Sequence, residues 1–278
     1  MRLLTKTMIH PSRTDSYLLY PLADLHLGAR ACDEDLLDTY VCQIRDTPHA
    51  LWVGLGDLID AILRKGDRRH FESLYSSDLW GKDDIIQHQI DRLMEHLRPI
   101  ADKCLGLVCG NHEKAVLRHY DNNAYEKIVR DIAAAGGHDQ NDLRLGTSGI
   151  LTLKFKRGKP TDASHPTQTF TVYCHHGYGG GRLKGGKALN LERKMLHVQT
   201  DVVLMGHVHD LLFTPKTLIL ADGTLRHCFG AFLPSFLRSY ELGHDSYAED
   251  AGYFPSVVGT FPIEFVPKTR QVIFHIST

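Results

Sequence analysis

The stretch Tyr17–Gly28, "YLLYPLADLHLG", joins an apolar run to two side chains of metal-ligand type. Residues 17–23 are predicted to form a buried strand, and Asp24 and His26 follow that strand at once. Four more apolar runs end in the same way, at Asp57, at Asn111 and His112, at His175 and His176, and at His207 and His209. Because strand ends bring together loops that are far apart in sequence, we expect these side chains to meet at one point.

The order of strands and helices indicates the fold class. Apolar periodicity predicts helices at residues 33–45, 84–98, 124–135 and 189–197, and strands at 17–23, 50–53, 105–109, 150–155, 169–174, 202–205 and 272–276. Ala221–Thr224 is a predicted hairpin turn. Alternation in the first half and an excess of strands in the second favour an α/β fold of two sheets flanked by helices. We predict one domain over residues 1–278, with insertions near 60–82 and 177–188.

Composition excludes some classes of protein. The 278 residues are 42% hydrophobic and 23% charged, with a formal net charge of -1, so any binding of a polyanion has to be local. No apolar run approaches the length of a membrane span, and a cytoplasmic location is the default expectation. The six cysteines include no Cys-x-x-Cys pair, which favours reduced, buried thiols over a zinc framework or disulfides.

The residue types at the strand ends indicate which metals they suit. Carboxylate, imidazole and amide oxygen together favour first-row divalent ions over magnesium or calcium, which prefer oxygen ligands alone. Each motif has a glycine beside it, which permits tight turns and leaves room for a substrate: Gly28, Gly56, Gly110, Gly177 and Gly206. A single Asp-x-His after a strand is usually a turn or a helix cap, but five such motifs in order indicate a metal centre.

The series Asp24-Leu25-His26, Gly56-Asp57, Gly110-Asn111-His112-Glu113, His176-Gly177 and Gly206-His207-Val208-His209 resembles the calcineurin-like metallophosphoesterase superfamily. The resemblance spans residues 24–209 and implies a four-layer αββα sandwich of two mixed sheets with a dinuclear centre. It implies that one ion is held by Asp24, His26, Asp57 and His209. It assigns the second ion to Asp57, Asn111, His176 and His207, with Asp57 bridging. Manganese is the favoured ion, and iron, nickel, cobalt and zinc are the alternatives.

This resemblance also implies the chemistry. Two ions about 3.5 Å apart can share a hydroxide that attacks a phosphate ester in line. His112, which is not a ligand, is placed either to protonate the leaving oxygen or to stabilise the charge of the transition state. Glu113 either orients His112 or starts the next helix, and Asp60 is either a partner of the ligands or a helix cap.

The fourth motif contains two adjacent histidines. Neighbours on a strand point to opposite faces, so only one of His175 and His176 enters the site. The position directly before glycine favours His176, and His175 is the alternate.

The loop that follows, Gly177–Lys187, "GYGGGRLKGGK", permits three interpretations. It matches the spacing of a nucleotide-binding P-loop, except that Ala188 stands where Ser or Thr is required. It could also be a mobile surface loop. We favour a substrate-binding loop, in which backbone N–H groups and three cations bind phosphate and an aromatic ring stacks on a base or sugar. The residues concerned are Tyr178, Arg182, Lys184 and Lys187.

The basic segment Arg64–Phe71 strengthens the third interpretation, because two cationic loops suit a substrate with several phosphates. The glycine-rich loop is also similar to loops of phage and prophage metallophosphoesterases that accompany DNA-processing enzymes. We therefore expect a phosphodiesterase or nuclease-like enzyme that acts on a phosphate ester such as a nucleotide or DNA, as a monomer or small homo-oligomer. The alternatives are a phosphomonoesterase, including a protein phosphatase, a nucleotide-sugar pyrophosphohydrolase, and a metal-containing DNA-binding protein without activity.

Overall fold

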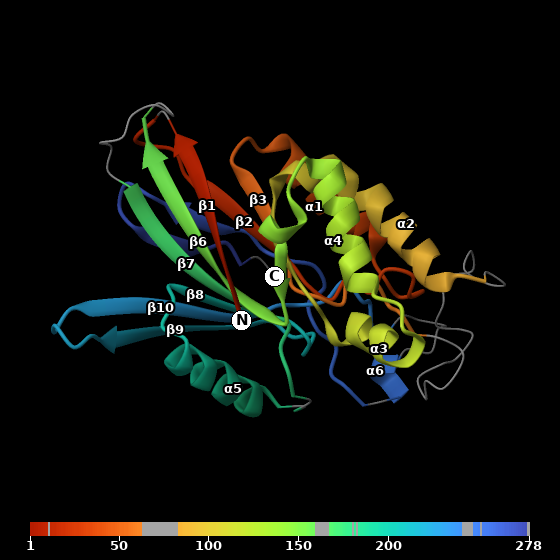
Figure 1. Cartoon of the computed structure of the whole chain (residues 1–278). Helices are drawn as coiled ribbons and strands as arrows, with labels where there is room; N and C mark the ends of the chain where they lie inside the picture. The colour runs from red at the N-terminus through yellow and green to blue at the C-terminus, as the bar shows by residue number, and fades with distance from the viewer. Residues whose placement is uncertain are drawn as a thin grey trace.

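Two mixed β-sheets lie face to face in the computed structural model, which describes residues 1–10, 12–62, 83–158, 167–179, 181, 183–240, 247–250 and 252–276 (Figure 1). The first sheet contains, in spatial order, β1 (Arg2–His10), β6 (Ser148–Arg157), β7 (Thr167–His175), β8 (Val202–Met205), β10 (Leu225–Phe232) and β9 (Leu212–Ile219). The second contains β12 (Gln271–Phe274), β11 (Ile263–Val266), β2 (Tyr17–Leu22), β3 (Ala50–Gly54), β4 (Cys104–Val108) and β5 (Arg144–Gly146).

Helices cover the outer face of each sheet (Figure 1). The second sheet carries α1 (Glu34–Asp46), α2 (Ile85–Leu97) and α4 (Ala124–Gly136), and the first carries α5 (Lys184–His197). The described residues also form α3 (Asn111–Tyr120), the short α6 (Tyr247–Asp250) and the 3-10 turns Arg98–Lys103 and Gln140–Asp142. The prediction of an αββα sandwich of two mixed sheets is confirmed.

Apolar side chains fill three separate layers. Leu19 and Val53 of the second sheet meet Val172 and Leu204 of the first in the core between the sheets. The outer layers lie under α1, α2 and α4 on one side and under α5 on the other. Leu191 and Met195 of α5 are fully buried, although this helix has a largely polar sequence. Burial of these layers supplies the main stabilisation of the sandwich.

Parallel pairing places the candidate ligands at one end of the sandwich. In the second sheet β2, β3 and β4 run parallel, so the loops after Leu22, Gly54 and Val108 leave the same edge. In the first sheet β7 and β8 run parallel, and their loops leave together as well. The carboxyl ends of five strands therefore deliver all five motifs.

Several elements differ from the sequence prediction, among them β1 and α5. The strand β1 was not predicted, because its half-buried positions, Leu4, Lys6 and Met8, include a cation that breaks the apolar alternation. Helix α5 begins at Lys184 and not at residue 189, so the second half of the glycine-rich loop forms its first turn. The Ala221–Thr224 turn connects β9 to β10 as predicted. Most of the predicted insertion at 60–82, including Arg64–Phe71, lies outside the described residues.

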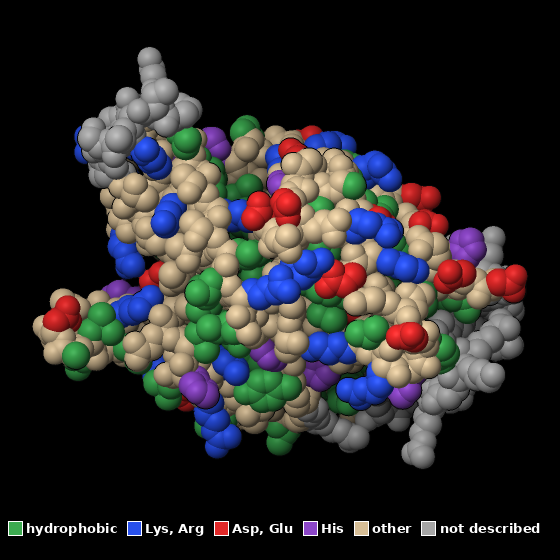
Figure 2. Space-filling view, in the orientation of Figure 1, with side chains coloured by type: hydrophobic (Ala, Val, Ile, Leu, Met, Phe, Trp, Pro, Cys, Tyr) green, Lys and Arg blue, Asp and Glu red, His purple; other side chains and the backbone are tan. Residues whose placement is uncertain are grey.

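Charged side chains are mixed by sign on the face shown in Figure 2, as expected for a chain of net charge -1. Among the helices that the structure describes, none has the length and apolar content needed to cross a bilayer.

Candidate metal centre

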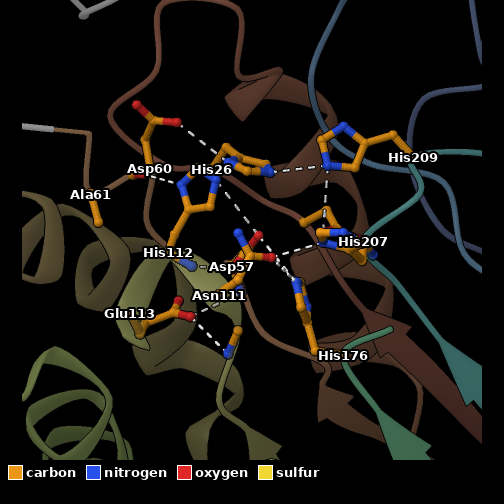
Figure 3. Close-up of polar contacts among 12 residues, drawn as sticks. His26, Asp57, Asp60, Ala61, Asn111, His112, Glu113, His176, His207 and His209 are labelled. Atoms are coloured by element: carbon orange, nitrogen blue, oxygen red, sulfur yellow. Dashed lines mark hydrogen bonds and ion pairs between the residues drawn. The ribbon is translucent and has the colours of Figure 1, made fainter. Parts of the chain in front are cut away.

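Unusual backbone geometry marks the loops that carry the motifs. Asp24, His26, Asp57, His207 and His209 all have a left-handed backbone, with φ between 48° and 73°. They are five of the nine non-glycine residues with positive φ in the described chain. Each such residue costs about 1–3 kcal/mol and persists only where its surroundings require it. The turns aim His26, His207 and His209 into the same space (Figure 3), and the donor atom of Asp24 lies within 4.8 Å of those of His26 and His209.

Asp24, His26 and His209 form the first cluster of donor atoms. Nε2 of His26 lies 3.2 Å from Nε2 of His209, and that nitrogen lies 3.5 Å from Oδ1 of Asp24. Asp24 is fully buried, and its other oxygen accepts the backbone N–H of His207 at 2.8 Å. This hydrogen bond connects the first cluster to the loop that supplies the second.

Asp57, His176 and His207 form the second cluster, with Asn111 between the two imidazoles. Oδ1 of Asn111 lies 2.7 Å from Nε2 of His176 and 2.8 Å from Nδ1 of His207. Oδ2 of Asp57 lies 3.2 Å from Nε2 of His176. The structure thus brings all seven predicted ligands together.

The donor atoms of the site have the composition of a divalent-metal site. Nδ1 of His176 donates to the Leu55 carbonyl oxygen at 2.9 Å, which leaves Nε2 as the nitrogen that faces the oxygens of Asn111 and Asp57. In the first cluster, Oδ1 of Asp24 is buried and has no hydrogen-bond partner among the described residues. Buried, electron-rich atoms that face one another are costly unless a cation lies between them. The donor set therefore fits divalent metal ions.

Electrostatic interactions keep the carboxylates ionised. Burial acts to raise the pKa of Asp57, but His112 and His176 beside it hold that pKa well below its usual range. Burial also acts to raise the pKa of Asp24, but His209 and His176 lower it, and the net effect is a lowered pKa. Burial lowers the pKa of His26, which favours the neutral imidazole that a ligand requires. For His176 burial also acts to lower the pKa, but Asp57 and Asp24 raise it to about 10.

His112 lies beside both clusters with a fixed ring orientation. Its Nδ1 donates to the backbone oxygen of Asp60, and its Nε2 points towards Oδ2 of Asp57 at 3.8 Å (Figure 3). The carboxylate of Asp60 lies 3.3 Å from Nδ1 of His26. Asp60 therefore contacts a ligand through its side chain and His112 through its backbone.

Glu113 has a contact that the sequence did not reveal. Its carboxylate accepts the backbone N–H groups of Asp57, Leu58 and Gly110, at 3.1, 2.8 and 2.9 Å. Glu113 lies in the first turn of α3, in agreement with the interpretation that it helps to start this helix. Its hydrogen bonds also connect the loop after β3 to the loop after β4. No orienting contact to the His112 ring is found among the hydrogen bonds described for Glu113.

Strand alternation separates the two adjacent histidines. Cys174 points into the core between the sheets, and His176 points the same way into the site. Tyr173 points into the outer layer under α5, and His175 stacks on it with ring centroids 6.1 Å apart. His175 lies outside both clusters, where its Nδ1 accepts the backbone N–H of Gly177 at 2.7 Å.

The predicted substrate loop is described in part. Tyr178 is exposed, Lys184 is exposed in the first turn of α5, and Nζ of Lys187 pairs with Asp210 at 3.0 Å. Asp210 follows His209 directly, so Lys187 lies beside the first cluster. Arg182 lies outside the described residues. Lys194 of α5, which the sequence did not single out, lies over the rings of Tyr173 and Tyr178.

No protein-family model matches this chain, and no curated protein matches it. Solved structures that resemble it include a predicted phosphoesterase from Streptococcus pneumoniae, which is 9% identical with a TM-score of 0.33 and an alignment covering 90% of this chain and 83% of that one. Zinc-bound Vps29 from Entamoeba histolytica is 13% identical with a TM-score of 0.37, covering 88% and 84%. The NAD nucleotidase NadN from Haemophilus influenzae is 11% identical with a TM-score of 0.42, covering 96% of this chain and 50% of NadN.

Proposed function

We propose that this chain is a dinuclear metal-dependent phosphoesterase of the calcineurin-like type, and that it acts on phosphodiesters. One observation carries the proposal. Two groups of donor atoms, Asp24/His26/His209 and Asp57/His176/His207, lie side by side at the ends of five strands, and the Asp24 carboxylate joins them by accepting the His207 N–H. This arrangement suits divalent cations, and the buried His112 lies beside it.

The seven side chains divide into two ligand sets. Asp24, His26 and His209 would hold one ion, His176, His207 and Asn111 the other, and Asp57 would bridge the two. When bound, two such ions supply Lewis-acid polarisation of a phosphoryl group and make water acidic enough to attack near neutral pH. The protein supplies the orientation, because the Leu55 carbonyl fixes the His176 ring and the Asp60 carboxylate faces the His26 ring.

His112 is the proposed general acid. Its Nδ1 faces a carbonyl oxygen, which only accepts, so Nδ1 keeps its proton and Nε2 is the nitrogen that exchanges one. Nε2 points into the site, where a leaving oxygen would need a proton. Because the ring is buried against the His26 ring, with centroids 4.6 Å apart, it has little freedom to turn away.

Cations next to the first cluster support a phosphodiester over a phosphomonoester. Lys187 lies beside His209 through its pair with Asp210, and Lys184 precedes it by one helical turn. The first turn of α5 carries no acidic residue, so its backbone N–H groups and its lysines favour an anion. We propose that Tyr178, Arg182, Lys184 and Lys187 contact the part of the substrate beyond the scissile phosphate.

Hydrolysis of bis-p-nitrophenyl phosphate with Mn²⁺ tests the proposal. Asp57→Asn should lower turnover about 100-fold or more, since even the outer partners of metal ligands are worth about 10- to 100-fold. His112→Ala should lower it about 100- to 10,000-fold, the usual value of a general acid. The matched controls are Asp222→Asn in the β9–β10 turn and His119→Ala on the exposed end of α3, and both should keep wild-type rates.

The same protein should be assayed on mono-, di- and pyrophosphate esters and on single- and double-stranded DNA, with Mn²⁺, Ni²⁺, Co²⁺, Zn²⁺ and Mg²⁺ in turn. A faster rate on monoesters than on diesters would favour a phosphomonoesterase. Stoichiometric metal and tight DNA binding without turnover would favour the DNA-binding protein. No turnover with any of these metals would exclude an enzyme of the proposed kind.

A further inference from the structure

Four side chains form an aromatic and cationic cluster directly beside the candidate metal centre. The ring of His175 stacks on Tyr173, with centroids 6.1 Å apart and planes 26° apart, and meets Tyr178 edge-on, with centroids 5.8 Å and planes 79° apart. Nζ of Lys194 lies 5.4 Å from the centre of the Tyr178 ring and 5.8 Å from that of Tyr173. Tyr173, His175, Tyr178 and Lys194 are called the Tyr178 cluster below.

The backbone fixes this cluster next to the second group of ligands. His175 is joined by one peptide bond to His176, and Tyr178 follows two residues later. The turn between them is closed by the hydrogen bond from Gly177 N–H to Nδ1 of His175. Gly177 itself, with φ at +113°, packs so tightly on Gly206 and His207 that a Cβ there would collide with the Gly206 oxygen. The backbone directly before Tyr178 therefore packs against the loop that carries His207.

Burial is uneven within the cluster, and this argues against a purely structural role. Tyr173 is 4% exposed and belongs to the apolar layer under α5, so its ring is a fixed support on which the His175 ring packs. Tyr178 is 42% exposed, although the edge of His175 and the charge of Lys194 hold its ring in place. An exposed ring that is held from two sides is organised in advance to stack on a flat partner. The ammonium group beside it adds attraction for a phosphate.

We infer that Tyr178 stacks on a nucleobase of the substrate and that His175 and Lys194 hold it in position to do so. The inference rests on the proposed function, because it names the substrate class of that site as a nucleotide or nucleic acid. Stacking is tolerant of base identity, so the cluster distinguishes base-bearing from base-free phosphodiesters without selecting a sequence.

Two measurements test the inference. In the first, fluorescence anisotropy in EDTA compares the binding of a labelled thymidine octanucleotide with that of an abasic octanucleotide of equal charge. In the second, hydrolysis with Mn²⁺ compares thymidylyl-thymidine with the corresponding diester that lacks both bases. The hydrolysis measurement with the dinucleotide tests whether the protein recognises the bases next to one phosphodiester. The anisotropy measurement with the octanucleotide tests whether it recognises the bases of a longer strand.

Tyr178→Ala should weaken binding and kcat/KM for the base-bearing substrates about fivefold or more, since one stacked base is worth at least that factor. It should leave the abasic substrates within about twofold. Tyr178→Phe should behave as wild type. Tyr120→Ala, on the exposed end of α3, is the matched control because its ring is 40% exposed and lies nine residues from Asn111.

Equal losses on base-bearing and abasic substrates, or no loss on either, would overturn the inference. Tyr178→Ala should keep a thermal stability near that of the wild type. Tyr178→Phe should keep the wild-type preference for base-bearing substrates, which would exclude misfolding as the cause of the loss in Tyr178→Ala. The anisotropy arm needs neither metal nor turnover. If the wild type hydrolysed nothing, the proposed function would fail, while the base preference would still be measured.

Discussion

The carboxylate of Glu113 accepts the backbone N–H of Asp57 at 3.1 Å, although 56 positions separate the two residues. The same carboxylate accepts the N–H groups of Leu58 and Gly110, so one side chain fixes the loops after β3 and β4 against each other. Those loops supply Asp57, Asn111 and His112. The geometry of the second cluster thus depends on a carboxylate that lies outside both groups of donor atoms.

Glu113→Ala should lower the free energy of unfolding by about 3 kcal/mol or more, because it leaves three buried N–H groups without acceptors. Glu113→Gln retains an acceptor oxygen and should cost about 1 kcal/mol. Affinity for Mn²⁺ should fall about 10- to 100-fold in the alanine variant. Urea denaturation in EDTA and titration calorimetry with Mn²⁺ measure the two effects. Glu95→Ala, on the exposed face of α2, is the control, and an alanine variant at 113 with wild-type metal affinity would contradict the prediction.

Gly110→Ala should impair the centre without removing a ligand. A Cβ at Gly110 would collide with Oδ1 and the backbone nitrogen of Asp57 and would lie 2.5 Å from the Glu113 carboxylate. The Asp57 carboxylate must then shift, so metal affinity and turnover should both fall at least about tenfold. Gly137→Ala is the matched control, because the space around that position is empty and only its left-handed backbone, at φ 71°, adds about 1–2 kcal/mol of strain. Equal effects of the two substitutions on metal binding would refute this role of Gly110.

How far the sequence predicted the fold depends on how local each signal is. The strands β2, β3, β4 and β8 were predicted because each is an apolar run, and β7 because its second half is rich in β-branched and aromatic residues. The ligands were predicted because each follows such a strand. The strand β1 was missed because it is half-exposed and carries Lys6 at a half-buried position. Helix α5 begins before the first residue of its apolar periodic pattern. Gly185 and Gly186 have low helix propensity, but the packing of Leu191 and Met195 against the first sheet overrides it.

The site contains features that no local pattern reveals. Asp24, Asp57 and His207 have a left-handed backbone although none of them is a glycine, so the residue type at these positions does not predict the conformation. Two contacts of the site join segments that are far apart in sequence: Glu113 with Asp57, and Lys194 with Tyr178. These segments become neighbours only when the sheets and α5 have packed together. Sequence alone likewise left His175 and His176 open, although the alternation Tyr173 outward, Cys174 inward shows which histidine the strand directs into the site.

Metal binding should stabilise the fold by a measurable amount. At a concentration of Mn²⁺ 100 times the dissociation constant, ligation adds about 2.7 kcal/mol to the free energy of unfolding. For a chain of this size that gain corresponds to a rise in Tm of about 5–10 °C over the value in EDTA. Asp57→Asn should show less than half of this rise, and Asp222→Asn should show all of it. Differential scanning fluorimetry with and without Mn²⁺ measures the shift, and a Tm that does not respond to any first-row divalent ion would argue against the centre.

His96 provides a pH-dependent contribution far from the metal centre. Its ring lies on α2 and contacts two carboxylates of α1, Asp38 at 2.6 Å and Glu34 at 3.0 Å, and Arg92 of α2 shares Glu34 with it at 2.8 Å. The Glu34 hydrogen bond raises the pKa of His96 above its usual 6.5, against the opposing effect of burial. Since the folded-state pKa exceeds the unfolded one, the stabilisation is complete below about pH 6.5 and is lost as pH rises through the folded-state pKa.

The free energy of unfolding of wild type should therefore exceed that of His96→Asn by about 1 kcal/mol at pH 6, the upper range for an ion pair near the surface, and by much less at pH 9. Urea denaturation at the two pH values, in EDTA so that the metal ligands contribute equally to both proteins, measures the difference. In a Glu34→Gln background the change between pH 6 and pH 9 should shrink, because the main cause of the raised pKa is gone. A difference between wild type and His96→Asn that stays constant from pH 6 to pH 9 would show that the imidazolium form of His96 does not stabilise the contact between α1 and α2.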